Sequence, residues 1–267
     1  MKCPAIILAV ASTAHGQFAG FSSSSLSSTT RGQAAVSADF DGDGDVDLAM
    51  VGTDGLGGVE GMRVYRNIGD GSFIELQTFG SSGDIGNDID TGDSDGDGIP
   101  DLLKTGGNVD LRWRRGNGDG TFQSPIDIPG FDASTSVVCD VDDDGDDDIV
   151  ASFGSSGLKT LLNDGAGNFT LASTTIANLD NPTPLESGDL DGDGDLDIVG
   201  LQDGSSSRFL VFINQGGGVF SLQNVDSLFL PQDLAVTDLD GDGSLDLAAT
   251  TGFGGNTAGV RILYNDG

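Results

Sequence analysis

A nine-residue pattern of aspartate and glycine occurs five times in the chain and constrains its fold more than any other feature. Each copy has Asp at positions 1, 3, 5 and 9 and Gly at position 6. The first positions are 54, 47, 49 and 49 residues apart. Self-similarity at a period of this length is typical of proteins that stack one supersecondary unit many times. The chain is therefore expected to be a repeat protein.

The spacing of the carboxylates fits a calcium ion. Ca²⁺ takes six to eight oxygen ligands at about 2.3–2.6 Å. Carboxylates at positions 1, 3 and 5 of a tight turn converge on one point, and glycine at position 6 permits the bend that turns the position-7 carbonyl inward. The carboxylate at position 9 closes the shell, in bidentate fashion. Only the backbone of position 7 is used, so its side chain is free to vary.

Five Ca²⁺ ions, one per repeat, are predicted, with a structural role, because the clustered carboxylates of one loop repel each other without a cation. Positions 1 and 3 supply Asp39, Asp93, Asp140, Asp189 and Asp238, and Asp41, Asp95, Asp142, Asp191 and Asp240. Position 5 supplies Asp43, Asp97, Asp144, Asp193 and Asp242. The position-7 carbonyls belong to Asp45, Ile99, Asp146, Asp195 and Ser244, and position 9 supplies Asp47, Asp101, Asp148, Asp197 and Asp246.

Magnesium, zinc and an EF-hand fit the pattern less well than a calcium-binding repeat loop. Magnesium favours fewer protein ligands and retains waters, and zinc favours sulfur and imidazole, which are absent from these loops. An EF-hand needs an acidic ligand at position 12, where this chain has Met50, Lys104, Ala151, Gly200 and Ala249. One copy could be an acidic surface turn, but five copies in register argue against that.

The rest of each repeat predicts four short strands. A short apolar run such as Leu48–Val51 follows each aspartate loop. A glycine-rich turn, Asn-x-Gly-x-Gly-x-Phe, recurs at 67–73, 163–169 and 214–220, and Gly116 replaces the Asn in the second repeat. Such turns between apolar runs indicate hairpins. Four strands in about 49 residues predict an all-β fold, a β-propeller of about five four-stranded blades.

The aspartate loop, the Asn-x-Gly-x-Gly-x-Phe turn and the period together resemble the FG-GAP/VCBS-type repeats of integrin-α-like β-propellers. The resemblance covers nearly all of residues 17–267. It implies a propeller whose blades each bind calcium in a loop between two strands. The Phe-Gly and Gly-Ala-Pro words that name the family are not recognisable, so the match is to the bacterial-style subgroup, and no integrin-like ligand role follows.

Two ways of completing the ring remain open. Phe18 stands 21 residues before Asp39, close to the distance from each turn Phe to the next loop, and the sequence stops at Gly267 within its last turn. Either the N-terminal segment supplies the outer strand of the last blade and closes a five-bladed ring, or the chain is a fragment of a longer, seven-bladed propeller.

The N-terminus predicts export. Lys2 is followed by the apolar run 5–11 and then by small residues, as in a secretory signal peptide. Residues 1–16 are assigned to this signal peptide and 17–267 to the propeller, which makes the protein secreted, extracellular or periplasmic. Only Cys139 remains after cleavage, so no intrachain disulfide is expected, and metal is the alternative staple.

Charge excludes some partners. The chain has 43 acidic and 11 basic residues, a net charge of −32, which argues against nucleic acid or an anionic membrane. No stretch approaches the roughly 20 apolar residues of a membrane span, so no membrane insertion is expected.

Catalysis is not expected. The single histidine, His15, lies before the predicted cleavage site, which leaves no histidine-based triad. Cys139 is expected to be a small buried residue. Trp113, within the basic segment 111–115, could stack on a sugar, but a basic residue recurs four positions before the turn residue, at Arg63, Arg112, Lys159 and Arg261. These side chains are expected to neutralise loop carboxylates.

Three functions remain open. The first is a calcium-stabilised interaction or adhesion module for a protein or cell surface. The others are a lectin-like carbohydrate-binding propeller and the non-catalytic propeller of a larger secreted enzyme. The ligand, protein or glycan, is expected at the loops that vary between repeats. These loops are Thr53–Gly61, Thr105–Val109, Phe153–Gly157, Gln202–Ser207 and Thr251–Gly259.

Overall fold

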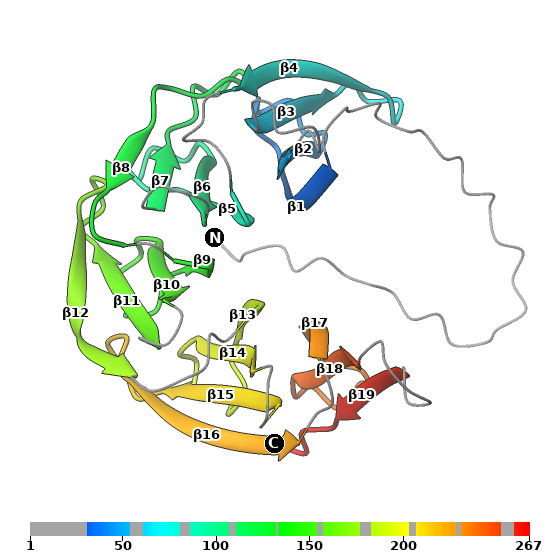
Figure 1. Ribbon diagram of the computed structural model, residues 1–267, viewed down its shortest axis with the longest axis vertical. Coiled ribbons are helices and arrows are strands. Elements are labelled where there is room, and N and C mark those ends of the chain that lie inside the picture. The colour runs from blue at the N-terminus through cyan, green and yellow to red at the C-terminus, as the bar shows by residue number, and fades with distance from the viewer. Residues whose placement is uncertain are drawn as a thin grey trace, which may run out of the picture.

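The chain forms a β-propeller. The computed structural model describes residues 31–53, 61–80, 86–106, 111–131, 133–153, 157–176, 183–202, 207–227, 231–251 and 259–267. Within these ranges the regular structure is all β-strand, in five antiparallel sheets placed around a common axis (Figure 1). The predicted all-β propeller of five blades is confirmed. These ranges contain no helix of the length and hydrophobicity that a membrane crossing requires.

Each blade is an antiparallel meander in chain order. The first blade contains β1 (Arg31–Ala38), β2 (Asp47–Thr53), β3 (Gly61–Asn67) and β4 (Phe73–Phe79). The second contains β5 (Asp88–Gly92), β6 (Asp101–Thr105), β7 (Leu111–Arg114) and β8 (Ile126–Ile128). The third contains β9 (Thr135–Cys139), β10 (Asp148–Ser152), β11 (Leu158–Asn163) and β12 (Phe169–Ile176). The fourth contains β13 (Leu185–Gly188), β14 (Asp197–Gln202), β15 (Arg208–Asn214) and β16 (Phe220–Ser227), and the fifth β17 (Pro231–Thr237), β18 (Asp246–Thr251) and β19 (Gly259–Leu263).

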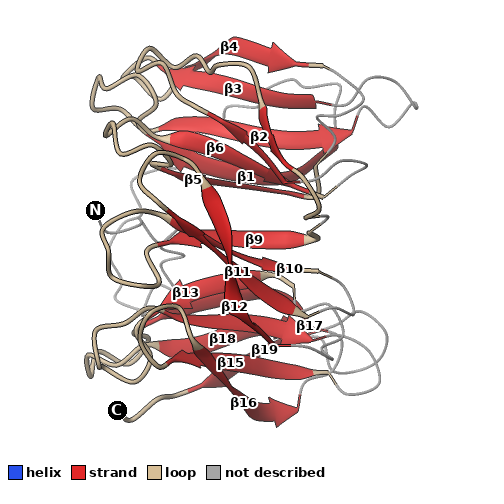
Figure 2. Ribbon diagram, turned by 90° about the vertical axis from the view of Figure 1, so that its left-hand side faces the viewer, coloured by secondary structure: helices blue, strands red, loops and turns tan. Residues whose placement is uncertain are grey.

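The meander places equivalent loops at the same end of every blade. The first strands, β1, β5, β9, β13 and β17, lie nearest the axis, and the fourth strands lie outermost (Figure 1). The aspartate loop joins the first strand to the second, and the glycine turn joins the third to the fourth. Because neighbouring strands are antiparallel, both connections leave from one end of the propeller, which is the tan side in Figure 2.

The fifth blade has three strands in the described part of the chain, in the order β17-β18-β19. The five blades follow an arc, with the first and fifth at its two ends (Figure 1). The N-terminal segment that was expected to add an outer strand to the fifth blade lies outside the described residues. The two ways of completing the ring therefore stay predictions.

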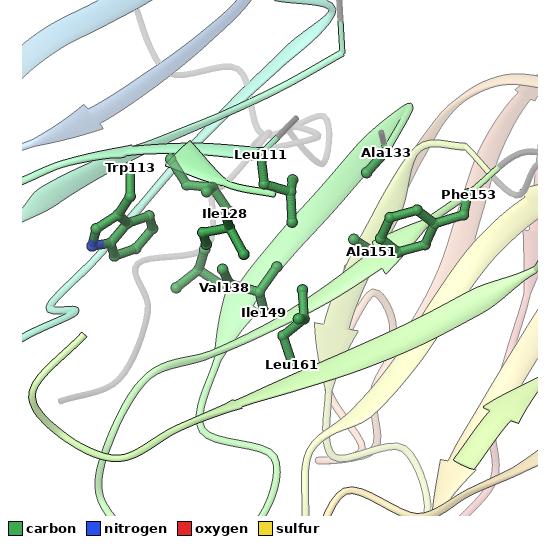
Figure 3. Packing of buried hydrophobic residues seen from close by; sticks show 10 residues of the cluster. Leu111, Trp113, Ile128, Ala133, Val138, Ile149, Ala151, Phe153 and Leu161 are labelled. Carbon is green, nitrogen blue, oxygen red and sulfur yellow. The ribbon is translucent and has the colours of Figure 1, made fainter. Parts of the chain in front are cut away.

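The hydrophobic core lies between the blades. Four clusters of buried side chains are each shared by two neighbouring sheets. Between the second and third blades, Leu111 and Trp113 meet Val138, Ile149 and Leu161 (Figure 3). Side chains alternate along a strand, so in the second, third and fourth blades one face of the sheet packs against the preceding blade and the other face against the next.

Two residues that the sequence singled out belong to this core. Trp113 is 1% exposed and makes an edge-to-face contact with Phe169 at 5.9 Å between ring centroids. It therefore cannot stack on a sugar, and that interpretation of segment 111–115 is wrong. Cys139 is buried in the cluster between the third and fourth blades, as expected for a structural residue.

Acidic side chains near the axis also link blades. Asp90 Oδ2 accepts the Val138 N–H at 2.7 Å, and Asp88 Oδ2 accepts the Thr135 hydroxyl at 2.6 Å. These bonds supply acceptors to β9, which is the edge strand of its sheet among the described strands. Burial raises the pKa of Asp90 to about 7, against the lowering effect of its hydrogen bonds to Thr91 and Val138.

Truncation of a side chain in an inter-blade cluster should unfold the propeller more easily. Phe212 is fully buried between the third and fourth blades. Phe212→Ala is expected to lower the free energy of unfolding by about 3–5 kcal/mol, through lost burial and a cavity. Ile74→Ala on β4, whose side chain is 47% exposed, is the control and should cost less than about 1 kcal/mol. Denaturant unfolding at fixed calcium measures both, and equal losses would contradict a core placed between blades.

The raised pKa of Asp90 predicts a specific pH dependence. A carboxyl whose pKa is higher in the folded state contributes stability that is fully present below its unfolded pKa of about 4 and is lost as pH rises through about 7. Asp90→Asn keeps the acceptor for Val138 but cannot titrate. The decline in the free energy of unfolding between pH 5 and pH 8 should therefore be smaller in Asp90→Asn than in the wild type, in buffers of equal calcium. An unchanged decline would show that Asp90 does not contribute to it.

Candidate metal centres

The aspartate loops have the predicted sharp bends. Glycine at position 6 has a positive φ in every blade, from +82° at Gly98 to +102° at Gly194. Position 4 also has a positive φ, and in the third loop it is occupied by Asp143 at +61°. Aspartate tolerates this region better than most residues. The loops thus adopt one geometry despite their sequence differences.

The position-9 aspartate anchors each loop. It is the first residue of the second strand in all five blades, and its exposure is 0–1%. Its Oδ2 accepts the N–H of the position-2 residue and its Oδ1 accepts the N–H at the Asn position of the glycine turn. At Asp197 both bonds, from Leu190 and Asn214, measure 2.8 Å. One carboxylate therefore joins the loop to the turn of its own blade.

The other aspartates accept hydrogen bonds from backbone N–H groups of the same loop. In the fourth blade, Asp189 accepts the N–H groups of Gly192 and Gly194 at 2.8 and 3.2 Å, and Asp193 accepts that of Asp195 at 3.0 Å. Equivalent bonds recur in the first and fifth loops. These bonds hold carboxylates over the concave side of the turn, because each oxygen must face its own backbone donor.

Three carboxylates come together in each blade. In the second to fifth blades the grouped residues occupy positions 1, 3 and 9, with one oxygen from each within 4.8 Å of the others. They are Asp93, Asp95 and Asp101; Asp140, Asp142 and Asp148; Asp189, Asp191 and Asp197; and Asp238, Asp240 and Asp246. In the first blade the group is Asp39, Asp41 and Asp43, at positions 1, 3 and 5. Each group could hold a metal ion. The full ligand sets, including the carbonyls at position 7, stay predictions.

Three loop oxygens fit a cation in particular. Asp95 Oδ1, Asp140 Oδ1 and Asp142 Oδ1 are buried and accept no hydrogen bond. A buried carboxylate oxygen without a donor carries a large desolvation cost, and a bound cation would offset it. Hard carboxylate oxygens without sulfur or imidazole are the donor set that Ca²⁺ or Mg²⁺ prefers. The residues present therefore fit a hard divalent ion.

The pKa values of several loop carboxyl groups agree with a site for a cation. Burial raises the pKa of Asp148 to about 7 and that of Asp101 to about 6, against the effect of their hydrogen bonds. Burial and the neighbouring Asp144 raise the pKa of Asp142. Asp43 differs, because the Asp45 N–H and the Arg66 guanidinium lower its pKa.

In the third, fourth and fifth blades, the asparagine of the glycine turn links the centre to the preceding blade. The Asn163 side chain donates to the carbonyl of Ser94 at 3.0 Å, and Asn214 donates to that of Val141 at 2.8 Å. Asn265 likewise donates to the Leu190 carbonyl at 2.7 Å. Each acceptor is the position-2 residue of the neighbouring aspartate loop. The sequence predicted that these asparagines are turn residues, but only the structure shows that their side chains form hydrogen bonds to another blade.

The basic residue that meets loop carboxylates is not the one expected. Arg63 pairs with Glu75 at 2.7 Å, and Arg112 pairs with Asp127 at 2.6 Å, both on the outer strand of the same blade. Lys159 lies 4.4 Å from the Phe153 ring. Four residues of strand place these side chains about 13 Å from the loop end of the strand. The predicted neutralisation by this position is therefore wrong in the first two blades.

Arginines one residue before the turn position contact the loops instead. Arg66 lies 2.7 Å from Asp41 and 2.9 Å from Asp43, and Arg115 lies 3.0 Å from Asp95. Asp147, at position 8 of the third loop, is a further residue that the pattern did not single out. Its Oδ2 accepts the Asp93 N–H of the second loop at 2.8 Å.

Comparison with solved structures finds one protein, Bap1, whose similarity supports the fold. The biofilm matrix protein Bap1 of V. cholerae is similar over 89% of this chain and 41% of that chain, at 17% identity and a TM-score of 0.51. A putative exo-β-1,3-galactanase from Bifidobacterium bifidum s17 is similar over 87% of this chain and 91% of that chain, at 15% identity and a TM-score of 0.44. The chain thus spans about two fifths of the length of Bap1. Likeness at these identities concerns the fold alone.

Family models give a more specific result. Among curated proteins, none matches the sequence. The model of the FG-GAP-like repeat matches residues 39–103, 140–200 and 189–249, and each match begins at position 1 of an aspartate loop. The matched segments cover most of the propeller and all five of its loops. The chain belongs to the FG-GAP-like repeat family.

Proposed function

We propose that this chain is a calcium-binding propeller that acts outside the cell as an interaction or adhesion module, with calcium as a structural ion. The observation that carries the proposal is the group of three carboxylates that recurs in every blade. The buried, donor-free oxygens of Asp95, Asp140 and Asp142 support a bound cation in the second and third blades.

Calcium would supply positive charge where the propeller gathers carboxylates. The position-9 aspartate, already fixed by two backbone N–H groups, would present its oxygens from the strand side. Position 1 and position 3 would present theirs from the loop side. The fixed loop would hold these ligands in place before the ion arrives, so little conformational entropy would be lost on binding. No residue of the centre needs to donate or accept a proton, which favours a structural role over a catalytic one.

The interaction role rests on the family and on the architecture. Propellers present connections at both ends of a rigid frame, and repeat proteins place binding at loops that vary between units. A similar propeller occurs in Bap1, which is described as a biofilm matrix protein, and this favours adhesion for the present chain. A protein or glycan is proposed as the ligand. The variable loops that would bind it lie almost wholly outside the described residues.

Calcium should stabilise the fold strongly. At a free concentration tenfold above the dissociation constant, one site contributes about 1.4 kcal/mol, so five independent sites would contribute about 7 kcal/mol. That is comparable with the ~5–15 kcal/mol stability of a typical domain. The melting temperature should therefore rise by many degrees between excess chelator and millimolar calcium, and by less in magnesium. The same melting temperature in chelator and in calcium would reject calcium as a structural ion.

Single loops can be tested by isosteric substitution. Asp191 belongs to the carboxylate group of the fourth blade. Asp191→Asn should remove one ion from the calcium stoichiometry, or weaken one site, as measured by equilibrium dialysis or calorimetry. Asp127→Asn is the matched control, because Asp127 is half exposed on β8 and pairs with Arg112. Loss of an ion in both variants, or in neither, would argue against the assigned centre.

The ligand class needs its own experiment. A glycan array probed with the calcium-loaded propeller separates a lectin-like role from a protein-binding one. Specific glycan signals that disappear with chelator would favour the lectin-like alternative. Binding to a protein surface without glycan signals would favour the adhesion role.

A further inference from the structure

Two of the five aspartate loops carry an arginine. In the first blade the Arg66 guanidinium lies between two carboxylates, 2.7 Å from Asp41 and 2.9 Å from Asp43. In the second blade Arg115 lies 3.0 Å from Asp95. Asp41, Asp43 and Asp95 are all at positions 3 or 5, which are proposed calcium ligands. Each guanidinium therefore meets the carboxylates that the ion would use.

The other three blades have no charged residue at the position immediately before the glycine turn. The residue before the turn Asn is Leu162 in the third blade, Ile213 in the fourth and Tyr264 in the fifth. Leu162 and Ile213 pack against the apolar clusters of their joints. The third loop also adds Asp143 and Asp147 to the common pattern. The repeats thus fall into two electrostatic classes, the first two blades and the last three.

We propose that Arg66 and Arg115 are built-in counter-charges that set the calcium affinity of the first two blades below that of the other three. This inference rests on the proposed function of the loops as calcium sites. In the absence of calcium, the guanidinium partly neutralises the loop carboxylates. Calcium therefore stabilises this loop less than a loop that has no arginine. It also repels an approaching divalent cation and competes for the same oxygens.

The size of the effect follows from Coulomb's law. One unit charge about 6 Å from a divalent ion in a water-like dielectric changes its affinity roughly tenfold, and salt reduces this. Calcium should therefore load the third, fourth and fifth blades first. The first and second blades would keep their loops folded at calcium concentrations too low to fill them.

Arg66 is the cleaner of the two residues for a test. Its side chain is 39% exposed, so a polar substitute can be solvated without leaving a cavity. Arg115 also donates to the Ala166 carbonyl of the third blade at 2.8 Å, so its removal changes a joint as well. Arg63 provides a matched control, because it lies on the same strand and pairs with Glu75 instead of a loop carboxylate.

The experiment is a calorimetric titration of the full chain with calcium, together with melting in chelator. The wild type should show two classes, with about three ions bound more tightly than two. Arg66→Gln should tighten one weak site roughly tenfold and lower the melting temperature in chelator. Arg66→Lys, which keeps the charge, should retain the weak site, and Arg63→Gln should leave calcium affinity unchanged.

The proposed role predicts that removal of the arginine lowers stability in chelator but raises calcium affinity, and this distinguishes it from an ordinary structural role. An arginine that only supports the fold would lower stability when removed and leave calcium affinity the same or weaker, and that result overturns the inference. Five equal sites in the wild type overturn it while leaving the proposed calcium function intact. Failure of the wild type to bind calcium overturns both. Failure of Arg66→Gln to fold in calcium also overturns the inference, because calcium must be able to replace the guanidinium.

Discussion

The structure depends on one buried carboxylate in each blade. The position-9 aspartate begins the second strand, is shielded from water, and accepts one backbone N–H on each oxygen. Because the first donor lies in the aspartate loop and the second in the glycine turn, this side chain fixes both connections at one end of the sheet. Neutral donors satisfy its hydrogen bonds but leave its charge, so a cation beside it is favoured. The same carboxylate thus joins the two connections of its blade and belongs, in the second to fifth blades, to the group that could hold a metal ion.

The same turn also contacts the preceding blade. Asn163, Asn214 and Asn265 use their backbone N–H for the carboxylate and their side-chain amide for the loop of the preceding blade. In the second blade Gly116 has no such amide, but Gly120 N–H donates to the Phe40 carbonyl at 3.0 Å, as Gly218 N–H donates to the Val141 carbonyl at 2.9 Å in the fourth blade. The second blade therefore keeps a backbone contact to the preceding loop although it lacks the side-chain contact. Neighbouring aspartate loops are connected through a short chain of hydrogen bonds.

Much of this architecture could be predicted from the sequence. The period predicted the blades, and the requirement for a positive φ explained the invariant glycine at position 6. These features are local, because a loop of nine residues largely determines its own geometry. The contacts of side chains on the third strand were predicted wrongly, because these contacts depend on which way each strand faces its neighbours. Trp113 was therefore a core residue, and Arg66 took the place expected for Arg63.

The placement of the centres at one end has a consequence for function. The aspartate loops and glycine turns share that end, whereas the second strands end and the third strands begin at the opposite end (Figure 2). Substitutions at the opposite end need not disturb the carboxylates or the asparagine contacts, because the full length of a strand separates the two. The aspartate loops can therefore stay constant while the opposite end varies. This separation suits the proposed role of an interaction module, because the opposite end can vary without loss of the carboxylate groups that could hold a metal ion.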